Sequence, residues 1–171
     1  MIGADIEALY LSLDPIRTGE AIREETMKSE IKWEGIDWHE ALKYLRINLT
    51  PYQARTLGIE HLLPERKFSR GPKPGITSDN ALSGDRKYED KWVQRVGVKS
   101  LDDKTKAKIM GCCLEVAIKI VFTKHCYKFG DHHYLQEGGG PTGLSSTGSS
   151  ADVRVTVWAT EVLKILTDSG I

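Results

Sequence analysis

The sequence predicts an α+β fold, with amphipathic helices packed on a small sheet whose strands are only partly present in this chain. Apolar residues recur at helical spacing over several stretches, whereas the alternating pattern of strands occurs near the N-terminus and again before a glycine-rich loop. With 171 residues, 40% of them hydrophobic and 28% charged, the chain has the composition of a globular protein. No repeat of solenoid length is visible, so we expect one domain over residues 1–171.

The first predicted strand covers residues 2–9 and begins almost at Met1. A core strand at an extreme terminus has no preceding element to cover it, so we expect flanking segments of the polypeptide to be missing. One face of this strand carries Asp5 and Glu7. The other face is apolar and consists of Ile2, Ala4, Ile6 and Ala8.

Three helices are predicted to follow. Asp14 before Pro15 favours a helix start, because Asp accepts a free N–H and Pro fits the first helical position, and this helix should reach about Lys28. The second covers residues 36–49, where apolar side chains share one face. The segment from Thr50 to Gln53 has the pattern of a capping box, which predicts a short third helix.

Residues 64–84 are rich in Gly, Pro and Ser and show no clear period, which predicts a loop or an excursion from the fold. Positive charge gathers near its start without an intervening acid, and this suits phosphate contacts. A solvated loop explains the same composition equally well. The positively charged residues are Arg66, Lys67, Arg70 and Lys73.

The longest predicted helix covers residues 101–124. Ser100 and Asp103 have the spacing of a cap for this helix, so the adjacent acids Asp102 and Asp103 are assigned to capping rather than to metal binding. We expect its buried stripe to consist of Ala107, Met110, Cys113, Leu114, Ala117, Ile120 and Val121.

The last part of the chain combines a hairpin, a loop and a helix. Residues 127–136 predict two short strands around a turn at Gly130 and Asp131. A loop rich in glycine and hydroxyl groups follows. Residues 151–166 then predict a helix, although Val153, Val155 and Val157 also alternate as in a strand.

Composition narrows the classes of function. Lys+Arg and Asp+Glu both number 24, so the charge of the whole chain gives no support to nucleic-acid binding. The three cysteines are an odd number, which argues against a disulfide framework and favours a reducing compartment. No apolar run has membrane-spanning length, and the N-terminus does not fit a signal peptide. We therefore expect a soluble intracellular protein, cytoplasmic or nuclear, without a membrane partner.

Two features are candidates for chemistry. Asp5 interrupts an apolar strand, where a carboxylate needs a cation, hydrogen bonds or water, and hard cations such as Mg²⁺ prefer oxygen ligands. A surface carboxylate is the alternative interpretation. The glycines after Gln136 let the backbone approach another molecule and expose N–H groups, and a flexible linker is the alternative there.

These two segments together resemble motifs of reverse transcriptases. The segment IGADIEALYLSL is similar to the first palm motif, in which a strand carries a metal-binding Asp and, five residues later, an aromatic residue under the nucleotide sugar. Asp5 and Tyr10 occupy those positions. The segment FGDHHYLQEGGGPTGLSSTGSSA resembles the later fingers–palm motif, and the resemblance extends over nearly the whole chain. Its matching positions are Phe129, Tyr134, Gln136, Gly139 and Gly143.

The resemblance implies a partial palm/fingers domain with an insertion at about 64–84. It implies that Asp5 and the carbonyl of Ile6 bind Mg²⁺, and that Tyr10 excludes a 2′-hydroxyl group. Gln136 and the glycine loop, with Gly139 and Gly143, would contact deoxynucleotides and the template strand. An RNA or DNA template–primer would be the partner, with basic contacts from Arg66, Lys67, Arg70 and Lys73.

The sequence departs from the family pattern in two places. Leu11 follows the motif aromatic, where Pro is common, and the third palm motif with its two adjacent aspartates is absent after Ala151. Two-metal catalysis needs more than one carboxylate. We therefore expect a full-length parent that is an RNA-directed DNA polymerase, and no activity from this chain alone.

Two other classes compete with a polymerase fragment. One is a catalytically dead, polymerase-derived domain that binds nucleic acid or protein. The other is a structural metal-binding module, which adjacent cysteines fit poorly because they point to different sides of a helix. Its ligands would be Cys112, Cys113, His125, Cys126, His132 and His133.

Overall fold

The computed structural model describes residues 13–70, 88–136, 138–141 and 144–169, with the side chains of 68–70 and 88–91 excepted. The chain divides into two compact units. The first consists of Met1–Ile36 with Asp102–Ile171, and the second of Asp37–Leu101. The predicted strand at 2–9 lies outside the described residues.

Helix α2 of the first unit covers Pro15–Lys28, as predicted. Asp14 Oδ1 accepts a hydrogen bond from the backbone N–H of Arg17 at 2.7 Å, so the carboxylate caps the helix at the expected residue. The backbone N–H of Ser29 donates to the carbonyl of Glu25 at 3.0 Å and closes the last turn.

Helix α5 covers Asp103–Lys124, and its acidic pair caps it as predicted, but Ser100 does not take the expected part in the cap. Asp102 is the capping residue, and its Oδ1 accepts from the backbone N–H of Thr105 at 2.8 Å. Ser100 instead donates its hydroxyl to the carbonyl of Gly97 at 2.8 Å, within the short 3-10 helix η1 at Val98–Ser100. Ser100 lies two residues before the N-cap position. Asp102 occupies that position, so its side chain can accept from an unpaired backbone N–H of the first helical turn.

The face of α5 that is buried also differs from the prediction. Ile120 is exposed, and Met110 and Cys113 are only half-buried. Gly111 and Glu115 are buried instead, because α2 packs along that side of α5. Apolar residues occur on several sides of this helix, so periodicity alone selected the wrong stripe. The buried residues are Ala107, Ile109, Gly111, Cys112, Glu115, Val116, Ile118 and Phe122.

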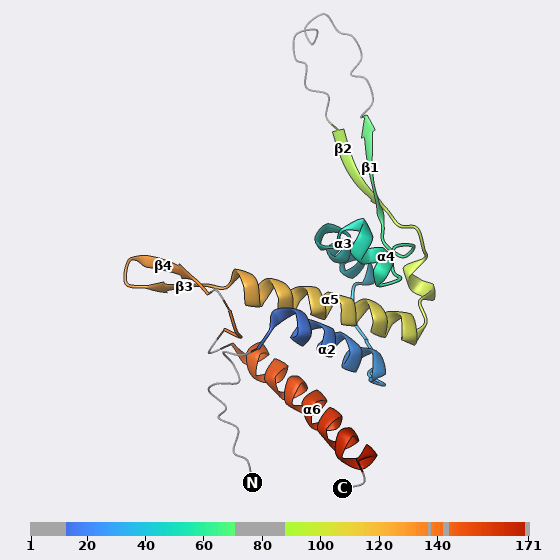
Figure 1. Ribbon diagram of the computed structural model, residues 1–171. Helices are drawn as coiled ribbons and strands as arrows, with labels where there is room; N and C mark the ends of the chain where they lie inside the picture. Colours follow the sequence, from blue (N-terminus) through green and yellow to red (C-terminus); the bar gives the residue numbers. More distant parts are fainter. Residues whose placement is uncertain (1–12, 71–87, 137, 142–143, 170–171) are drawn as a thin grey trace, which may run out of the picture. The chain divides into compact units, whose positions relative to one another are not determined.

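Two glycines allow α2 and α5 to pack closely (Figure 1). A Cβ atom on Gly111 would lie 3.0 Å from the carbonyl oxygen of Arg23, and one on Gly19 would lie 3.1 Å from that of Glu115. Larger residues would therefore separate the two helices.

Helix α6 covers Ser145–Asp168 and also contacts α2. It confirms the predicted helix of the last segment but begins earlier than predicted, inside the hydroxyl-rich stretch. Its first turns are buried at Thr147, Ser150 and Ala151, whereas later residues such as Trp158 are exposed. Leu13, Ile118, Phe122 and Ala151 form a common apolar core cluster.

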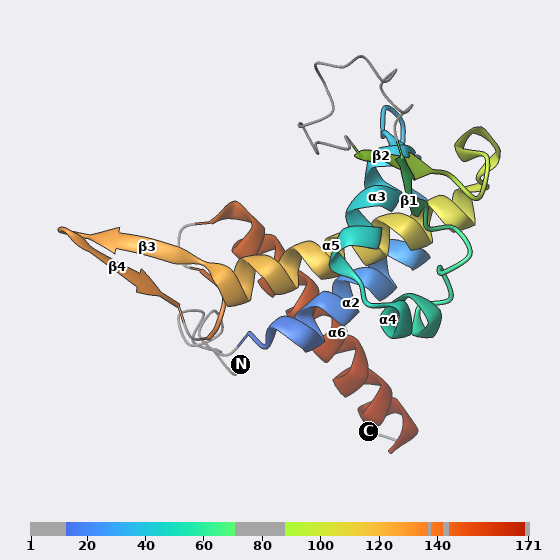
Figure 2. The same ribbon diagram turned by 90° about the horizontal axis from the view of Figure 1, so that it is seen from above.

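Hairpin β3–β4 follows α5 and confirms the prediction (Figure 2). Strand β3 covers Cys126–Phe129 and β4 covers His132–Leu135, paired antiparallel. Gly130 at the turn has a φ of 60°, which glycine adopts without steric cost. Both strands are exposed throughout.

The second unit begins with two helices that match the prediction closely. Helix α3 covers Trp38–Asn48, and helix α4 covers Pro51–Thr56. Thr50 and Gln53 form the predicted capping box, in which the Thr50 hydroxyl accepts from the Gln53 N–H at 3.2 Å. The buried apolar residues of this unit are Trp38, Leu42, Leu45, Leu49, Ala54, Ile59, Leu62, Leu63 and Leu101.

The predicted loop at 64–84 is corrected in part. Strand β1 covers Glu65–Arg70 and pairs antiparallel with β2 at Tyr88–Val93. The basic stretch therefore begins on a strand, whose charged residues concealed its pattern. Residues 71–87 lie outside the described part.

The described residues thus form helices with two small antiparallel sheets, in keeping with the coarse prediction of an α+β fold. None of their helices is both long enough and apolar enough to cross a membrane.

Candidate nucleotide and nucleic-acid site

Gln136 ends the hairpin β3–β4 and holds the start of the glycine loop. Its backbone N–H donates to the carbonyl of His125 at 3.0 Å, which joins the two ends of the hairpin. Its side-chain Nε2 donates to the carbonyl of Gly138 at 2.9 Å and to that of Gly139 at 3.2 Å. The amide N–H groups are therefore already bonded to the loop carbonyls, and a ligand that accepted from them would displace those contacts.

The glycines of this loop have different roles. Gly139 is buried and has a φ of 74°, a conformation that side chains with a Cβ rarely adopt. A Cβ atom on Gly140 would lie 2.4 Å from Thr147 Cγ2 and 3.1 Å from Leu13 Cδ1. Gly138 is exposed, and a Cβ atom there would meet nothing within 4 Å.

The contact at Gly140 brings two distant parts of the sequence together. Leu13 comes three residues after Tyr10, where the first motif ends, and Gly140 belongs to the second motif. Both lie against Phe122 of α5, whose Cζ would be 3.3 Å from a Cβ on Gly140. The chain that leaves one motif thus packs on the loop of the other.

The start of α6 fixes the far end of the glycine loop. The hydroxyl of Thr147 donates to the carbonyl of Pro141 at 2.7 Å, and both residues are buried. Leu144 occupies the capping position and provides no side-chain cap, so hydroxyl-rich residues begin the helix directly. The exposed hydroxyl residues in this first turn are Ser145 and Ser146.

The second unit contributes the basic candidates Arg66 and Lys67, both exposed on β1. The guanidinium of Arg66 lies over the ring of Trp92 on β2, 5.7 Å from its centroid, which is within the range of a cation–π contact. Lys67 is the register partner of Lys91. Successive residues of a strand point to opposite faces, so Arg66 and Lys67 cannot line one surface together.

Several predicted site residues are not described. Asp5, Ile6, Tyr10, Lys73 and Gly143 lie outside the described residues, and the side chain of Arg70 does so as well. Their roles in binding metal, nucleotide or nucleic acid stay predictions.

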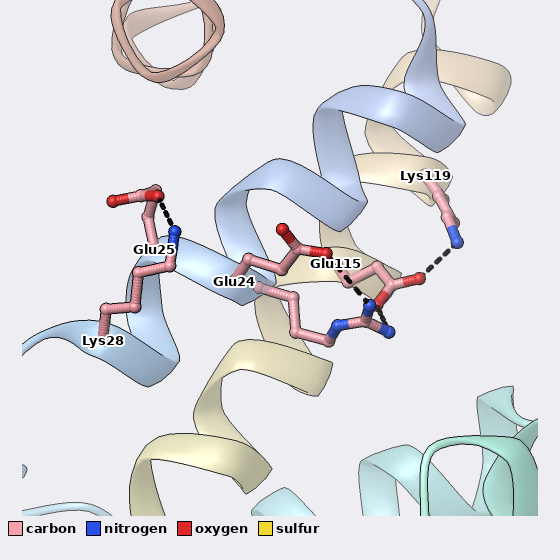
Figure 3. Close-up of polar contacts among 6 residues, drawn as sticks. Glu24, Glu25, Lys28, Glu115 and Lys119 are labelled. Carbon is pink, nitrogen blue, oxygen red and sulfur yellow. Dashed lines mark hydrogen bonds and ion pairs between the residues drawn. The ribbon is translucent and has the colours of Figure 1, made fainter. Parts of the chain in front are cut away.

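A buried carboxylate lies between α2 and α5, away from these candidates in the sequence. Glu115 is 8% exposed, and its two oxygens face Lys119 at 2.5 Å and Arg23 at 3.1 Å (Figure 3). Oε1 accepts a hydrogen bond from Lys119, whereas Oε2 is paired with Arg23 by charge and has no hydrogen-bond partner among the described residues. This arrangement is that of a structural ion cluster between two helices. Glu25 and Lys28 in the same view form an exposed pair within α2.

The cysteines give no support to a metal module. Burial raises the pKa of Cys112 to about 11 and that of Cys113 to about 12, so neither is poised as a thiolate ligand. Among the described residues, no group of three His, Cys, Asp or Glu side chains could hold a metal ion.

Comparison of this chain with protein-family models, with curated proteins and with solved structures finds no match.

One feature that the sequence prediction overlooked is the exposed aromatic face of β3–β4. Tyr127 and Tyr134 are cross-strand partners, and their rings stack with centroids 5.5 Å apart at 18°. Phe129 and His132 are the next pair on the same face. The alternation of these four rings around the turn in the sequence could have predicted that they share one face of the hairpin.

Proposed function

We propose that this chain is part of an RNA-directed DNA polymerase, which joins deoxynucleotides on a template by two-metal chemistry. The proposal rests on the resemblance of the two motifs, their order and their spacing. Asp5 and the carbonyl of Ile6 would hold Mg²⁺, and Tyr10 would lie under the sugar of the incoming nucleotide. Gln136, Gly139 and Gly143 would contact that nucleotide and the template.

The packing of Leu13 on Gly140 is the observation that supports the proposal most strongly. The two motifs are separated by more than 100 residues in the sequence, and a shared nucleotide site requires them to come close together. Leu13 and Ala151 belong to one core cluster with Phe122. The described chain that follows the first motif thus shares a core with the residues around the glycine loop.

Metal chemistry requires more carboxylates than the first motif supplies. Mg²⁺ would polarise the reacting phosphate and the attacking oxygen. The contribution of this chain would be to bind and orient the nucleotide, with the Gln136 amide released from the carbonyls of Gly138 and Gly139. We therefore propose that the parent is active and that this chain alone is not.

A primer-extension assay tests the proposal. The isolated chain should produce no extension with Mg²⁺ and deoxynucleotides, whereas a chain extended through the two missing aspartates should produce it. Asp5→Asn should abolish synthesis in the extended protein. Tyr10→Ala should increase ribonucleotide incorporation there. Robust extension by the isolated chain, lost on Asp5→Asn, would contradict the inactivity; an extended chain with intact aspartates that fails to synthesise would contradict the polymerase.

The rival is a polymerase-derived binding domain without catalysis. The positive charge of residues 37–101 supports such a binding role. This segment contains 12 Lys+Arg and 8 Asp+Glu, whereas acidic residues outnumber basic ones in the rest of the chain. The downstream reading frame separates the two functions. An aromatic residue followed by two aspartates supports the enzyme, and a stop codon supports the binding domain.

A further inference from the structure

We propose that the aromatic face of β3–β4 is a stacking platform for the bases of a single-stranded nucleic acid. The inference extends the proposed function by giving an unpaired strand a binding surface, but it requires no catalysis. The face consists of Tyr127, Phe129, His132 and Tyr134, which alternate with the residues of the opposite face.

The rings of this face are accessible. Tyr127 is 49% exposed, Tyr134 43% and Phe129 76%, although large aromatic side chains are usually more deeply covered. A two-stranded hairpin by itself is marginally stable in water, and its exposed rings add an unfavourable contact with solvent. A ligand that covered these rings would remove that unfavourable contact. Figure 2 shows the hairpin extending beyond the end of α5, its neighbour within the first unit.

The rings are also preorganised. Tyr127 and Tyr134 stack across the strands, and His132 meets Tyr134 edge-on, with centroids 6.5 Å apart. Each contact restricts side-chain rotation before a ligand arrives, so binding loses less conformational entropy. A base that stacked on this pair would continue an existing arrangement of flat rings.

The chemistry of the face favours bases over a protein segment. It consists of flat aromatic rings, with polar tips on both tyrosines, and contains no aliphatic side chain. The anchors of protein partners bind in well-packed, desolvated pockets, which the exposed face of a two-stranded hairpin differs from. Every base presents a π-face, and an aromatic platform therefore accepts a strand without sequence preference.

Local charge is complementary to a phosphate backbone. Lys124 ends α5 beside the hairpin, and Lys128 lies on β3, where its register partner is His133. Within residues 124–136 the one acidic residue is Asp131 at the turn. Lys128 alternates with the rings and therefore lies on the opposite face of the hairpin. The two lysines thus place positive charge near the platform, which attracts a phosphate backbone without contacting the stacked bases.

Binding of labelled thymidine and uridine oligomers to the full chain, measured by fluorescence anisotropy, tests the platform. Phe129→Ala and Tyr127→Ala should each weaken binding about 5- to 150-fold, the range for loss of one stacked base. Phe129 lies outside the stacked tyrosine pair, so its removal leaves the hairpin contact intact. Tyr52→Ala is the matched control, because Tyr52 is an exposed tyrosine of α4, and it should have no effect.

An abasic oligomer of equal length separates stacking from charge. It retains the phosphates but lacks bases, so the platform predicts weaker binding to the wild type and no further loss on Phe129→Ala. Equal affinity for abasic and base-containing oligomers would overturn the inference and leave the face to a protein partner. Unchanged oligomer affinity in both alanine variants would overturn it as well. Primer extension measures DNA synthesis and not oligomer affinity. A negative result in the binding assay would therefore overturn the platform without overturning the proposed polymerase function, and the reverse also holds.

Discussion

At the scale of single residues, Gly140 is the position that most restricts the candidate site. Substitution to Ala would place a Cβ 2.4 Å from Thr147 Cγ2, within the packing that joins α6 to Leu13. Overpacking of this kind costs about 1–3 kcal/mol of unfolding free energy. We expect Gly140→Ala to lower the urea midpoint accordingly.

Gly138→Ala is the matched control for that prediction. Its Cβ would meet nothing within 4 Å, and its φ is not positive. The change should stay within about 0.5 kcal/mol in the same urea titration. Equal losses in the two variants would contradict the close packing of Gly140 against Thr147 and Leu13.

The buried carboxylate gives a second prediction at this scale. Glu115→Gln removes the negative charge between Arg23 and Lys119 and weakens the hydrogen bond from Lys119, which as a bond to a charged group contributes about 1.5–3 kcal/mol. The two cations are 22% and 34% exposed, so they can still hydrate. We expect a loss of about 1–3 kcal/mol in unfolding free energy, measured by urea denaturation.

The same substitution at an exposed pair provides the control. Glu25→Gln disrupts the pair with Lys28 on the surface of α2 and should leave the urea midpoint unchanged. If Glu25→Gln were as destabilising as Glu115→Gln, the buried cluster would have no special structural role.

At the scale of elements, the cap of α5 predicts a pH dependence. Hydrogen bonds from Thr105 hold the pKa of Asp102 below its ordinary value. A carboxyl group with a lowered folded-state pKa stabilises the fold above its unfolded pKa, and this contribution is lost as the pH falls through the folded pKa. Acidification below the usual Asp range should therefore weaken α5.

Asp102→Asn is the variant that tests this cap. Asn keeps an oxygen acceptor but does not titrate in this range. The wild type should be more stable than the variant at neutral pH, and the difference should vanish as Asp102 becomes protonated. Urea midpoints followed by helical circular dichroism measure it, and a gap that stayed constant on acidification would contradict the assignment.

Elements with strong local signals were predictable, and those set by tertiary contacts were not. Asp14 with Pro15 and the Thr50 capping box fixed two helix starts, because a cap depends on a few neighbouring residues. The buried face of α5 depends instead on α2, whose close approach at Gly111 no periodicity reveals. Strand β1 was missed because its charged residues hide the alternation.

The candidate site likewise contains residues that a local motif predicted and contacts that only tertiary packing determines. Gln136 and Gly139 were identified from a motif, and the structure adds that the amide of Gln136 binds the loop carbonyls. The contact of Leu13 with Gly140 could not be predicted, since it depends on how α2, α5 and α6 pack. The aromatic face around Tyr127 was visible as an alternation but had no assigned role.

At the scale of the whole molecule, positive charge is concentrated in residues 37–101. Lys67 is exposed there on β1. If this surface contacts phosphates, Lys67→Gln should reduce the slope of log affinity against log salt by about 1 for a template–primer duplex.

Lys43→Gln provides a control of equal charge change in the same unit. Lys43 forms an ion pair with Glu40 at 3.2 Å, so its charge is already compensated, and the salt slope should stay unchanged. Anisotropy titrations at several salt concentrations measure both variants. Identical slopes for Lys67→Gln and the wild type would remove the Lys67 face of β1 from the nucleic-acid surface.

The proposed function requires both motifs to bind the same nucleotide. Amide NMR of the isotope-labelled chain, titrated with a magnesium–deoxynucleotide complex, can detect this binding at both motifs in one experiment. We expect the signals of Tyr10 and of Gln136 to shift together with one dissociation constant, and Asp5→Asn to abolish both shifts. Shifts confined to one motif, or none at either, would contradict the claim.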